Sequence, residues 1–402
     1  MTIPRFNDGS GRVCRLIRPL YGLKQSGNVW NEEFTSTISE FGFTQLKTDY
    51  CCFIRREENN FTILIVWVDD ILSFSLTEAG NDRIEKELKG KFEVKSIGNP
   101  TLILGMKFTQ GDNIISLSQA HFVEDLLQKF GLENANPVST PMDPNIDLDA
   151  PEDLENEETP NNKISDSYAT LIGSLMYLSL ATRPDITYAV NRLAQFTSNP
   201  LPKHWTAIKR IFRYLKGTKN YSLTYGGSEE ILNQNLNIFC DADWAADANR
   251  KSVSGYVITL AGGAVAWSSK KQATVALSTA ESEYISATHA AKQVLWHRSL
   301  FTELEIKLPR TSTIFSDNQA AIAIAHHPEF HARTKHIDIA YHFLCDLVKS
   351  NILNLVYINT HENLTDLFTK GLPKWIILFR NPVSARNPGF LTFCGNPMKF
   401  LI

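Results

Sequence analysis

Four acidic residues in the second half of the chain have the types and spacing of a metal-dependent catalytic site: Asp241, Glu283, Asp317 and Asp366. Asp241 and Asp317 each end a predicted strand. Glu283 lies near the start of a predicted long helix, and Asp366 begins a later one. Carboxylates that lie close together repel one another unless a divalent cation neutralises them. Two Mg²⁺ ions roughly 3.5–4 Å apart suit such a group, because they can clamp the attacking and leaving oxygens of a phosphodiester hydrolysis.

These positions also have a purely structural interpretation. Aspartate is common at strand ends and at helix N-caps, so Asp241, Asp317 and Asp366 need not bind anything. A second acidic pair, Asp69 and Asp70, lies between the apolar runs FTILIVWV and ILSFSL, which predicts a β-hairpin with an acidic turn. Such a turn can equally be a solvated turn without a metal. Both acidic groups therefore need support beyond their spacing.

The elements that would hold the four carboxylates form an α+β pattern. From Leu236 onward the predicted order is three strands, a long helix, a strand, two helices, a strand and a helix. The three opening strands are LNIFCDAD, SVSGYVITLA and GAVAWSSKK, the fourth ends at FSDN, and the last is NLVYINT. This order predicts a mixed sheet flanked by helices.

Composition divides the chain before this pattern. Residues 1–135 mix short strands and helices, and residues 166–230 are mainly helical. Residues 136–165 are rich in proline, aspartate and glutamate, which predicts an exposed acidic linker or loop. The last stretch, residues 375–402, has no clear periodicity, and we expect it to pack poorly.

A basic face is predicted on the helix HWTAIKRIFRYLKGT. Lys209, Arg213 and Lys216 follow one another at i, i+4 and i+7, apart from the apolar stripe of the same helix. The three cations form either a solvated flank or a set of contacts to a nucleic-acid backbone, which needs only positioned charges. The residues alone leave both interpretations open.

Composition limits the class of protein. The 402 residues suffice for two or three domains, and 43% hydrophobic with 21% charged residues is ordinary for a globular protein. A formal net charge of −3 argues against a polycation that coats nucleic acid without selection. The six cysteines form no CxxC pair, no signal sequence is visible, and the apolar run from Phe61 to Val68 is too short to span a bilayer. We therefore expect an intracellular protein of the cytoplasm, the nucleus or both, without a membrane partner.

The words around the four carboxylates resemble a known family. The segments CDADWAAD, SGYVITL, AVAWSSKKQ, ALSTAESEYISA, IFSDNQAA, HARTKHIDIAYHF and NLTDLFTKGL occur in one order and one register. Together they resemble the ribonuclease H domain of Ty1/copia-type retrotransposon polyproteins. Upstream, IRPLYGLKQSGNVWNEEF, LIVWVDDIL, LGMKF, TRPDITYAVNRLAQF and HWTAIKRIFRYLKGT are similar to the reverse transcriptase and connecting segments of the same family.

The resemblance covers roughly residues 11–374 and implies a multidomain α+β protein with a partial polymerase palm, a helical thumb or connection, and a ribonuclease H-like sheet. The implied domains are a partial reverse transcriptase palm and thumb at 1–135, the acidic linker at 136–165, a helical connection at 166–230, the ribonuclease H domain at 235–374 and a divergent tail at 375–402.

The resemblance also implies roles for individual residues. The tetrad would bind Mg²⁺, with Mn²⁺ as a substitute, and cleave RNA in RNA–DNA hybrids. Ser254, Trp267, Ser268 and Lys270 would lie near the hybrid, although a buried Trp267 is an equal alternative. On the polymerase side Asp69 and Asp70 would be metal-binding catalytic residues, and Lys24 and Gln25 would lie against an RNA/DNA template-primer.

Two histidine groups have open interpretations. His361, five residues before Asp366, could gate product release or shuttle protons. The segment with His331, His336 and His342 either binds zinc or contacts the hybrid and packs a helix, and the second is favoured because no cysteine joins it.

Polymerase activity is expected to be lost. The family's upstream aspartate segment, which resembles Asp-Val-x-x-Ala-Phe-Leu, does not occur, and neither does the fingers region. A truncated copy that keeps a nuclease is therefore expected. The alternatives are a nucleic-acid-binding relic or domesticated protein without catalysis, and polymerase complementation by a separate piece. The oligomeric state is left open.

Overall fold

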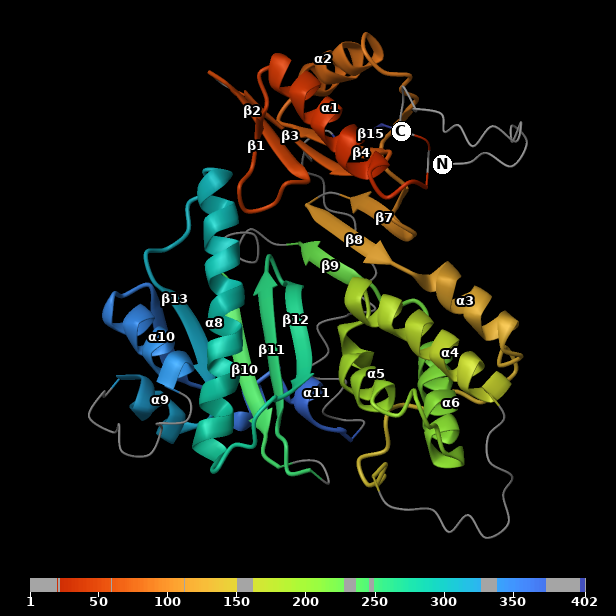
Figure 1. Cartoon of the computed structure of the whole chain (residues 1–402), viewed down its shortest axis with the longest axis vertical. Coiled ribbons are helices and arrows are strands. Elements are labelled where there is room, and N and C mark those ends of the chain that lie inside the picture. Colours follow the sequence, from red (N-terminus) through yellow and green to blue (C-terminus); the bar gives the residue numbers. More distant parts are fainter. Residues whose placement is uncertain are drawn as a thin grey trace, which may run out of the picture. The chain divides into compact units, whose positions relative to one another are not determined.

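The computed structural model describes residues 20, 22–58, 60–111, 113–149, 162–227, 236–245, 249–326, 338–373 and 398–401 (Figure 1). Its contacts divide into two compact units, residues 1–100 with 396–402, and residues 101–395. This division differs from the predicted boundary near residue 135, which stays a prediction about the family's domains. Within the described ranges no helix combines the length and the apolarity that crossing a membrane requires.

In its described residues the first unit has one sheet and two helices. Its elements are α1 (Ser26–Glu40), β1 (Thr44–Gln45), β2 (Cys52–Glu57), β3 (Asn60–Trp67), β4 (Asp70–Ser75), α2 (Glu78–Lys89), β5 (Ser96–Gly98) and β15 (Met398–Leu401). The strand order is β1-β2-β3-β4-β15-β5. Apolar residues of both helices pack on the sheet around Phe53 and Leu64. The amphipathic spacing of α1 and α2 thus gives this unit its own core.

Within the tail, residues 398–401 form strand β15, which the sequence did not predict, whereas residues 374–397 lie outside the described part. Met398 pairs with Phe74 and Leu401 with Ile71, antiparallel to β4. On its other side Phe400 pairs with Gly98 of β5. Four residues are too few to show the alternation of apolar and polar residues that predicts a strand. They form a strand here because they pair with the edges of β4 and β5.

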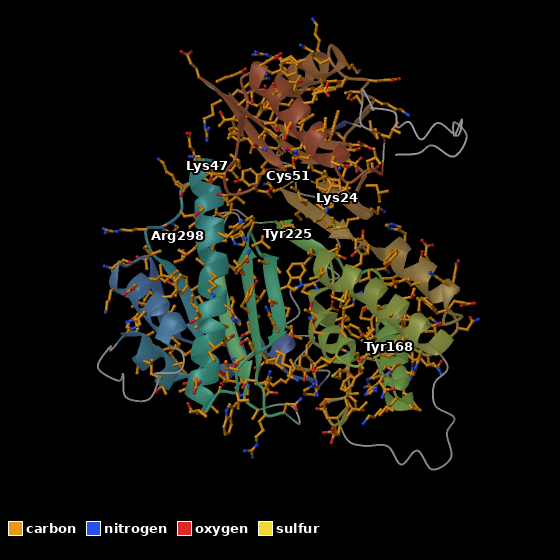
Figure 2. All side chains as sticks on the ribbon, viewed as in Figure 1. Lys24, Lys47, Cys51, Tyr168, Tyr225 and Arg298 are labelled. Carbon is orange, nitrogen blue, oxygen red and sulfur yellow. The ribbon has the colours of Figure 1, made fainter. Side chains whose placement is uncertain are left out.

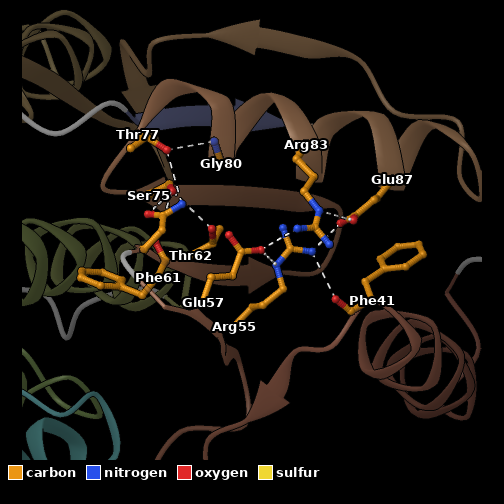
Figure 3. A network of polar contacts seen from close by, with 11 residues as sticks. Phe41, Arg55, Glu57, Phe61, Thr62, Ser75, Thr77, Gly80, Arg83 and Glu87 are labelled. Atoms are coloured by element: carbon orange, nitrogen blue, oxygen red, sulfur yellow. Dashed lines mark hydrogen bonds and ion pairs between the residues drawn. The ribbon is translucent and has the colours of Figure 1, made fainter.

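A polar network attaches α2 to the sheet (Figure 3). Arg55 is buried in β2, and its Nη1 lies 2.6 Å from Oε2 of Glu87 on α2 and 3.2 Å from the carbonyl oxygen of Phe41. Arg83 bridges the same Glu87 at 2.9 Å and Glu57 at 2.6 Å. A buried guanidinium needs such partners because an unpaired charge would be strongly destabilising.

The second unit begins with a small sheet and a helical cluster. The sheet has the order β6-β7-β8-β9 and the strands Leu102–Ile103, Met106–Gly111, Ile114–Ser118 and Leu223–Gly226. The helices are α3 (Ala120–Lys129), α4 (Asn162–Ala181), α5 (Thr187–Ala194) and α6 (Pro202–Gly217), with a 3₁₀ turn at Pro184–Ile186. They share one apolar core, which includes Tyr168 (labelled in Figure 2). The Tyr168 hydroxyl donates to the Leu193 carbonyl at 2.9 Å.

The segment before α4 differs from the predicted exposed linker in its described part, residues 136–149. Met142 and Leu148 are buried in the helical core. Arg210 of α6 donates to Thr140 Oγ1 at 2.7 Å, and Arg192 of α5 lies 2.7 Å from Asp149. Because proline and acidic residues dominate this segment, its composition did not indicate that Met142 and Leu148 are buried. Residues 150–161 lie outside the described part.

The five-stranded sheet has the order β12-β11-β10-β13-β14, with strands Gly263–Lys271, Val253–Leu260, Asn237–Asp243, Ser312–Ser316 and Leu353–Tyr357. The first three are antiparallel, and β10, β13 and β14 run parallel. Helices α8 (Thr279–Glu303), α9 (Gln319–His326), α10 (Asp338–Lys349) and α11 (Asp366–Thr369) and a 3₁₀ turn (Thr360–Glu362) complete it. This confirms the predicted mixed sheet flanked by helices, and Figure 1 shows α8 lying along it.

Candidate active site

Asp241 lies near the end of the central strand β10, and the residue is 4% exposed. Its neighbour across the sheet is Gly255 of β11. A Cβ at position 255 would lie 2.8 Å from Thr369 Cγ2 and 2.9 Å from Phe368 Cβ. Glycine is therefore required there, because it lets the short helix α11 pack directly over the strand beside Asp241.

Glu283 is positioned by the first turn of α8. The Ser278 hydroxyl caps the helix by accepting from the Glu281 amide at 3.2 Å, and Glu281 Oε2 accepts from the Leu277 amide at 2.8 Å. One turn later the Ser286 hydroxyl lies 2.7 Å from the Asp241 carbonyl oxygen. Residues three apart share a helix face, so Glu283 points to the same end of β10.

Asp317 follows β13, which runs parallel to β10. The next residue, Asn318, accepts from the Ala321 amide at 2.9 Å and so begins α9 directly after the carboxylate. The structure brings Asp241, Glu283 and Asp317 together, with one oxygen of each within 4.8 Å of the others. Three elements that are distant in sequence thus bring their carboxylates to one place: two strands near their ends and one helix near its start.

Asp366 is placed differently. It is 3% exposed at the start of α11, and that start is fixed by Asn363, whose amide donates to the Cys240 carbonyl at 3.0 Å. Asp366 does not belong to the group of three within 4.8 Å. Its Oδ1 lies 2.7 Å from the Lys370 ammonium, which is also 4.0 Å from Asp241 Oδ2.

Two residues of this centre were missed from the sequence. The Thr369 hydroxyl donates to Asp241 Oδ2, and Lys370 is the cation between Asp241 and Asp366. Residues i+3 and i+4 of a helix lie beside residue i. The segment DLFTK therefore places Thr369 and Lys370 next to Asp366, and their position could have been predicted from it. The missed residues therefore lie within the motif that located Asp366.

Burial and mutual repulsion shift the acidity of these carboxyl groups. Burial, and then the charges of Asp241 and Asp317, raise the pKa of Glu283 to about 10. Burial raises the pKa of Asp241 to about 6 against the opposing effect of Lys370. Burial opposes the charge of Lys370 itself, but Asp241 and Asp366 outweigh it and raise the pKa of this ammonium. More negative charge is gathered here than one lysine balances.

The donor set fits a hard divalent cation. Glu283 is 6% exposed, and its Oε2 has no hydrogen-bond partner in the described part of the chain. A buried carboxylate oxygen without a donor is unfavourable unless something else compensates it. Carboxylate oxygens are the ligands that Mg²⁺ and Mn²⁺ prefer, so Asp241, Glu283 and Asp317 are suited to hold such an ion.

Lys370→Met is expected to strengthen divalent-cation binding about tenfold, because the ammonium beside Asp241 and Asp366 competes for the same negative charge. The same change should lower the melting temperature in EDTA, since it leaves carboxylates uncompensated. Titration with Mn²⁺ followed by calorimetry measures the first effect, with the exposed Lys349→Met as control. An unchanged Mn²⁺ affinity would show that Lys370 does not compete.

The hairpin of the first unit presents the second acidic pair. Strands β3 and β4 are joined by a two-residue turn of Val68 and Asp69, and Trp67 pairs with Asp70. Val68 has φ 55°, an unfavourable conformation for a β-branched residue, and its carbonyl accepts from Trp30 Nε1 at 3.0 Å. Within the described residues, no third acidic, histidine or cysteine side chain joins Asp69 and Asp70 around a common position.

The other predicted contact residues are scattered. Lys24 and Gln25 are exposed just before α1, and Lys270 is exposed near the end of β12. Lys209 is exposed on α6, whereas Arg213 donates to the Asn136 carbonyl at 2.7 Å and Lys216 to the Ala135 carbonyl at 2.9 Å. Two of the three cations of this helix thus bind backbone carbonyls of the segment that follows α3.

The aromatic and histidine candidates also differ in environment. Trp267 is half-buried and donates to the Ser179 carbonyl at 2.8 Å. Ser254 is buried, Ser268 is half-buried, and His361 and His342 are exposed. His331 and His336 lie outside the described residues.

Comparison with known proteins identifies relatives of the chain. The family described as reverse transcriptase (RNA-dependent DNA polymerase) matches residues 4–144. The Retrovirus-related Pol polyprotein from transposon TNT 1-94 of Nicotiana tabacum is 38% identical over 366 residues, 90% of this chain and 27% of that protein. The corresponding polyprotein from transposon RE1 of Arabidopsis thaliana is 36% identical over 375 residues, 91% of this chain and 24% of that protein. The chain therefore spans about a quarter of the length of these curated relatives.

Among solved structures, the crystal structure of LC11-RNase H1 in complex with RNA/DNA hybrid matches 34% of this chain and 94% of that chain. The sequence identity is 14% and the TM-score 0.26, too low to support an inference about function. The assignment thus rests on the sequence relatives. The chain belongs to the Pol polyprotein family of Ty1/copia-type retrotransposons, and its reverse transcriptase segment is followed by a mixed five-stranded sheet flanked by helices.

Proposed function

We propose that the five-stranded sheet and its helices form a divalent-metal-dependent nuclease that cleaves RNA in RNA–DNA hybrids. The observation that carries this proposal is the convergence of Asp241, Glu283 and Asp317 within 4.8 Å, together with the buried, unpartnered Oε2 of Glu283. Membership of the Pol polyprotein family supports nucleic acid as the substrate.

The residues of the site have separable roles in this proposal. Asp241, Glu283 and Asp317 would hold divalent cations, which would supply an activated water and neutralise charge on the departing oxygen. Asp366 of α11 would act beside this group of three and outside it, as the acidic partner of Lys370, while Thr369 and Lys370 orient and balance Asp241. Selectivity for RNA would come from contacts to the 2′-hydroxyl group, which DNA lacks.

Asp317→Asn is expected to reduce cleavage of a labelled RNA–DNA hybrid at least about 100-fold in Mg²⁺, because it removes one charged metal ligand. The reaction should be absent in EDTA and restored by Mg²⁺ or Mn²⁺. Asp346→Asn, an exposed acidic residue on α10, is the matched control and should cleave normally. Circular dichroism establishes that each variant is folded.

Two outcomes would overturn the proposal. One is equal cleavage by the protein and its Asp317→Asn variant, which would mean that the activity comes from elsewhere. The other is a folded protein that binds the hybrid and leaves it uncut in both cations, which would favour the non-catalytic alternative.

We also propose that this 402-residue chain does not polymerise DNA by itself. Asp69 and Asp70 supply two carboxylates at the hairpin tip, and no third ligand lies beside them within the described ranges. Primer extension on an RNA template tests this proposal, because incorporation of nucleotides by the purified chain would contradict it.

A further inference from the structure

Gln272 is a buried amide at the point where the chain leaves the sheet for the helix that carries Glu283. It follows β12 directly, and the residue is 2% exposed. Its Nε2 donates to the Ser254 hydroxyl of β11 at 2.8 Å and to the Ser282 carbonyl of α8 at 2.9 Å. One side chain therefore attaches the first turn of α8 to the end of β12 and to the neighbouring strand.

The connection from Gln272 to α8 is short and mostly exposed. Of residues 273–278, Ala276 is buried and the other five are exposed. A connection with few buried contacts restrains the following helix weakly. The position of the first turn of α8 is therefore set by side chains buried between the helix and the sheet.

Ser286 provides a second buried attachment on the same helix. Its hydroxyl lies 2.7 Å from the Asp241 carbonyl oxygen and 3.0 Å from that of Gly255. Residues i and i+4 share one face of a helix, so Ser282 and Ser286 hold the same face of α8 at two points. Glu283 lies between these two points in the sequence, and both its height along the helix and its direction are thus fixed.

The amide of Gln272 has one favourable orientation. The Ser282 carbonyl can only accept a hydrogen bond, so Nε2 and not Oε1 must face it. Oε1 then has no hydrogen-bond partner among the described residues. A buried carbonyl oxygen without a donor is unfavourable, and an apolar side chain of the same length would avoid it. Stability alone therefore explains this amide poorly, whereas its two donated hydrogen bonds explain it as a group that fixes α8.

The position of this turn matters because it carries a candidate metal ligand. Glu283, Asp241 and Asp317 each place one oxygen within 4.8 Å of the others. Mg²⁺ takes oxygen ligands at about 2.0–2.1 Å and allows little freedom of geometry. A shift of α8 by about 1 Å would therefore be enough to weaken the contribution of Glu283.

We propose that Gln272 is a positioning residue of the carboxylate site. Its two hydrogen bonds hold the first turn of α8 where Glu283 can share a divalent cation with the two aspartates. The proposal rests on the proposed nuclease function for the presence of this cation. Gln272 does not bind the cation itself, and it acts through Ser254 and Ser282.

Calorimetric titration of the full chain with Mn²⁺ tests this role. Gln272→Met keeps the length of the side chain and removes both donated hydrogen bonds. We expect the Mn²⁺ affinity to fall about tenfold, an effect typical of losing a group that orients a metal ligand. Gln293→Met, the same substitution further along α8, should bind Mn²⁺ as the unsubstituted chain does. Circular dichroism establishes that each protein is folded at the temperature of the titration.

The titration separates positioning from stabilisation. If Gln272 only stabilises the fold, Gln272→Met will lower the melting temperature in EDTA and leave the Mn²⁺ affinity of the folded protein unchanged, which would overturn the proposal. Ser254→Ala is a second variant, and it decides the matter if Gln272→Met does not fold. It removes one of the two acceptors, so it should weaken Mn²⁺ binding in the same direction by a smaller factor.

Failure of the proposed nuclease would give a different result from failure of this role. An unsubstituted chain that binds no Mn²⁺ would contradict the metal site itself, and the role of Gln272 with it. Equal Mn²⁺ affinities of the unsubstituted chain and of both variants would contradict the role of Gln272 alone.

Discussion

Glu283→Gln is expected to stabilise the metal-free protein at pH 8 while abolishing cleavage of the hybrid. Burial and the neighbouring Asp241 and Asp317 raise the pKa of Glu283 in the folded state to about 10, against an ordinary value of 4.5. The folded state therefore keeps a proton that the unfolded state releases. Stability falls as pH rises between these two values, by up to about 1.4 kcal/mol per pH unit.

Glutamine resembles the protonated carboxyl group but does not titrate, so it removes this loss. At pH 8 in EDTA we expect the variant to be more stable on the order of 2–4 kcal/mol. Thermal melts between pH 5 and pH 9 measure the effect, and the variant should show the shallower dependence on pH. Added Mg²⁺ should stabilise the unsubstituted protein more than the variant, because only the former keeps this ligand. Identical pH dependence in the two proteins would contradict the assignment of an unfavourable charge to Glu283.

Asp185→Ala is expected to destabilise the helical cluster by about 3–5 kcal/mol, because it leaves a buried guanidinium without its counter-ion. Arg183 and Asp185 are each 2% exposed. The guanidinium donates to both carboxylate oxygens of Asp185, at 2.9 and 2.7 Å, and to Thr218. The Tyr214 hydroxyl donates to the same carboxylate at 2.7 Å. One substitution thus leaves several buried donors unsatisfied.

A variant that removes the whole group separates this mechanism from simple loss of packing. Arg183→Met, Asp185→Leu and Tyr214→Phe together replace the ion pair and the hydroxyl by apolar groups of similar size. This triple variant should be considerably more stable than Asp185→Ala, because burying no charge is less unfavourable than burying one alone. Urea unfolding followed by circular dichroism compares the two. A triple variant as unstable as Asp185→Ala would show that side-chain shape, and not charge, dominates.

Local patterns explain how much of the candidate site was predictable. Asp241 and Asp317 end parallel neighbouring strands, and a Ser-capped helix begins just before Glu283, so their convergence follows from chain order. The hairpin of Asp69 and Asp70 follows from two apolar runs around a turn. The predicted α+β fold is also confirmed, because hydrophobic periodicity within each segment determines which segments form helices and which form strands.

Non-local contacts explain what the sequence could not predict. The burial of Met142 and Leu148 depends on grooves that α5 and α6 create far along the chain. The roles of Arg213 and Lys216 depend on where the chain near Asn136 happens to pass. None of these contacts produces a recognisable pattern of apolar and polar residues in the segments that make it.

The position of β15 in the sheet affects how the first unit can fold while the chain is being synthesised. Met398 is synthesised 300 residues after Gly98, yet it lies between β4 and β5. At translation rates of about 5–20 residues per second, roughly 15–60 s separate the appearance of β5 from that of β15. During that interval two strand edges stay unpaired on the nascent chain, and such edges attract other strands. The sheet of the first unit therefore cannot be completed until β15 has been synthesised.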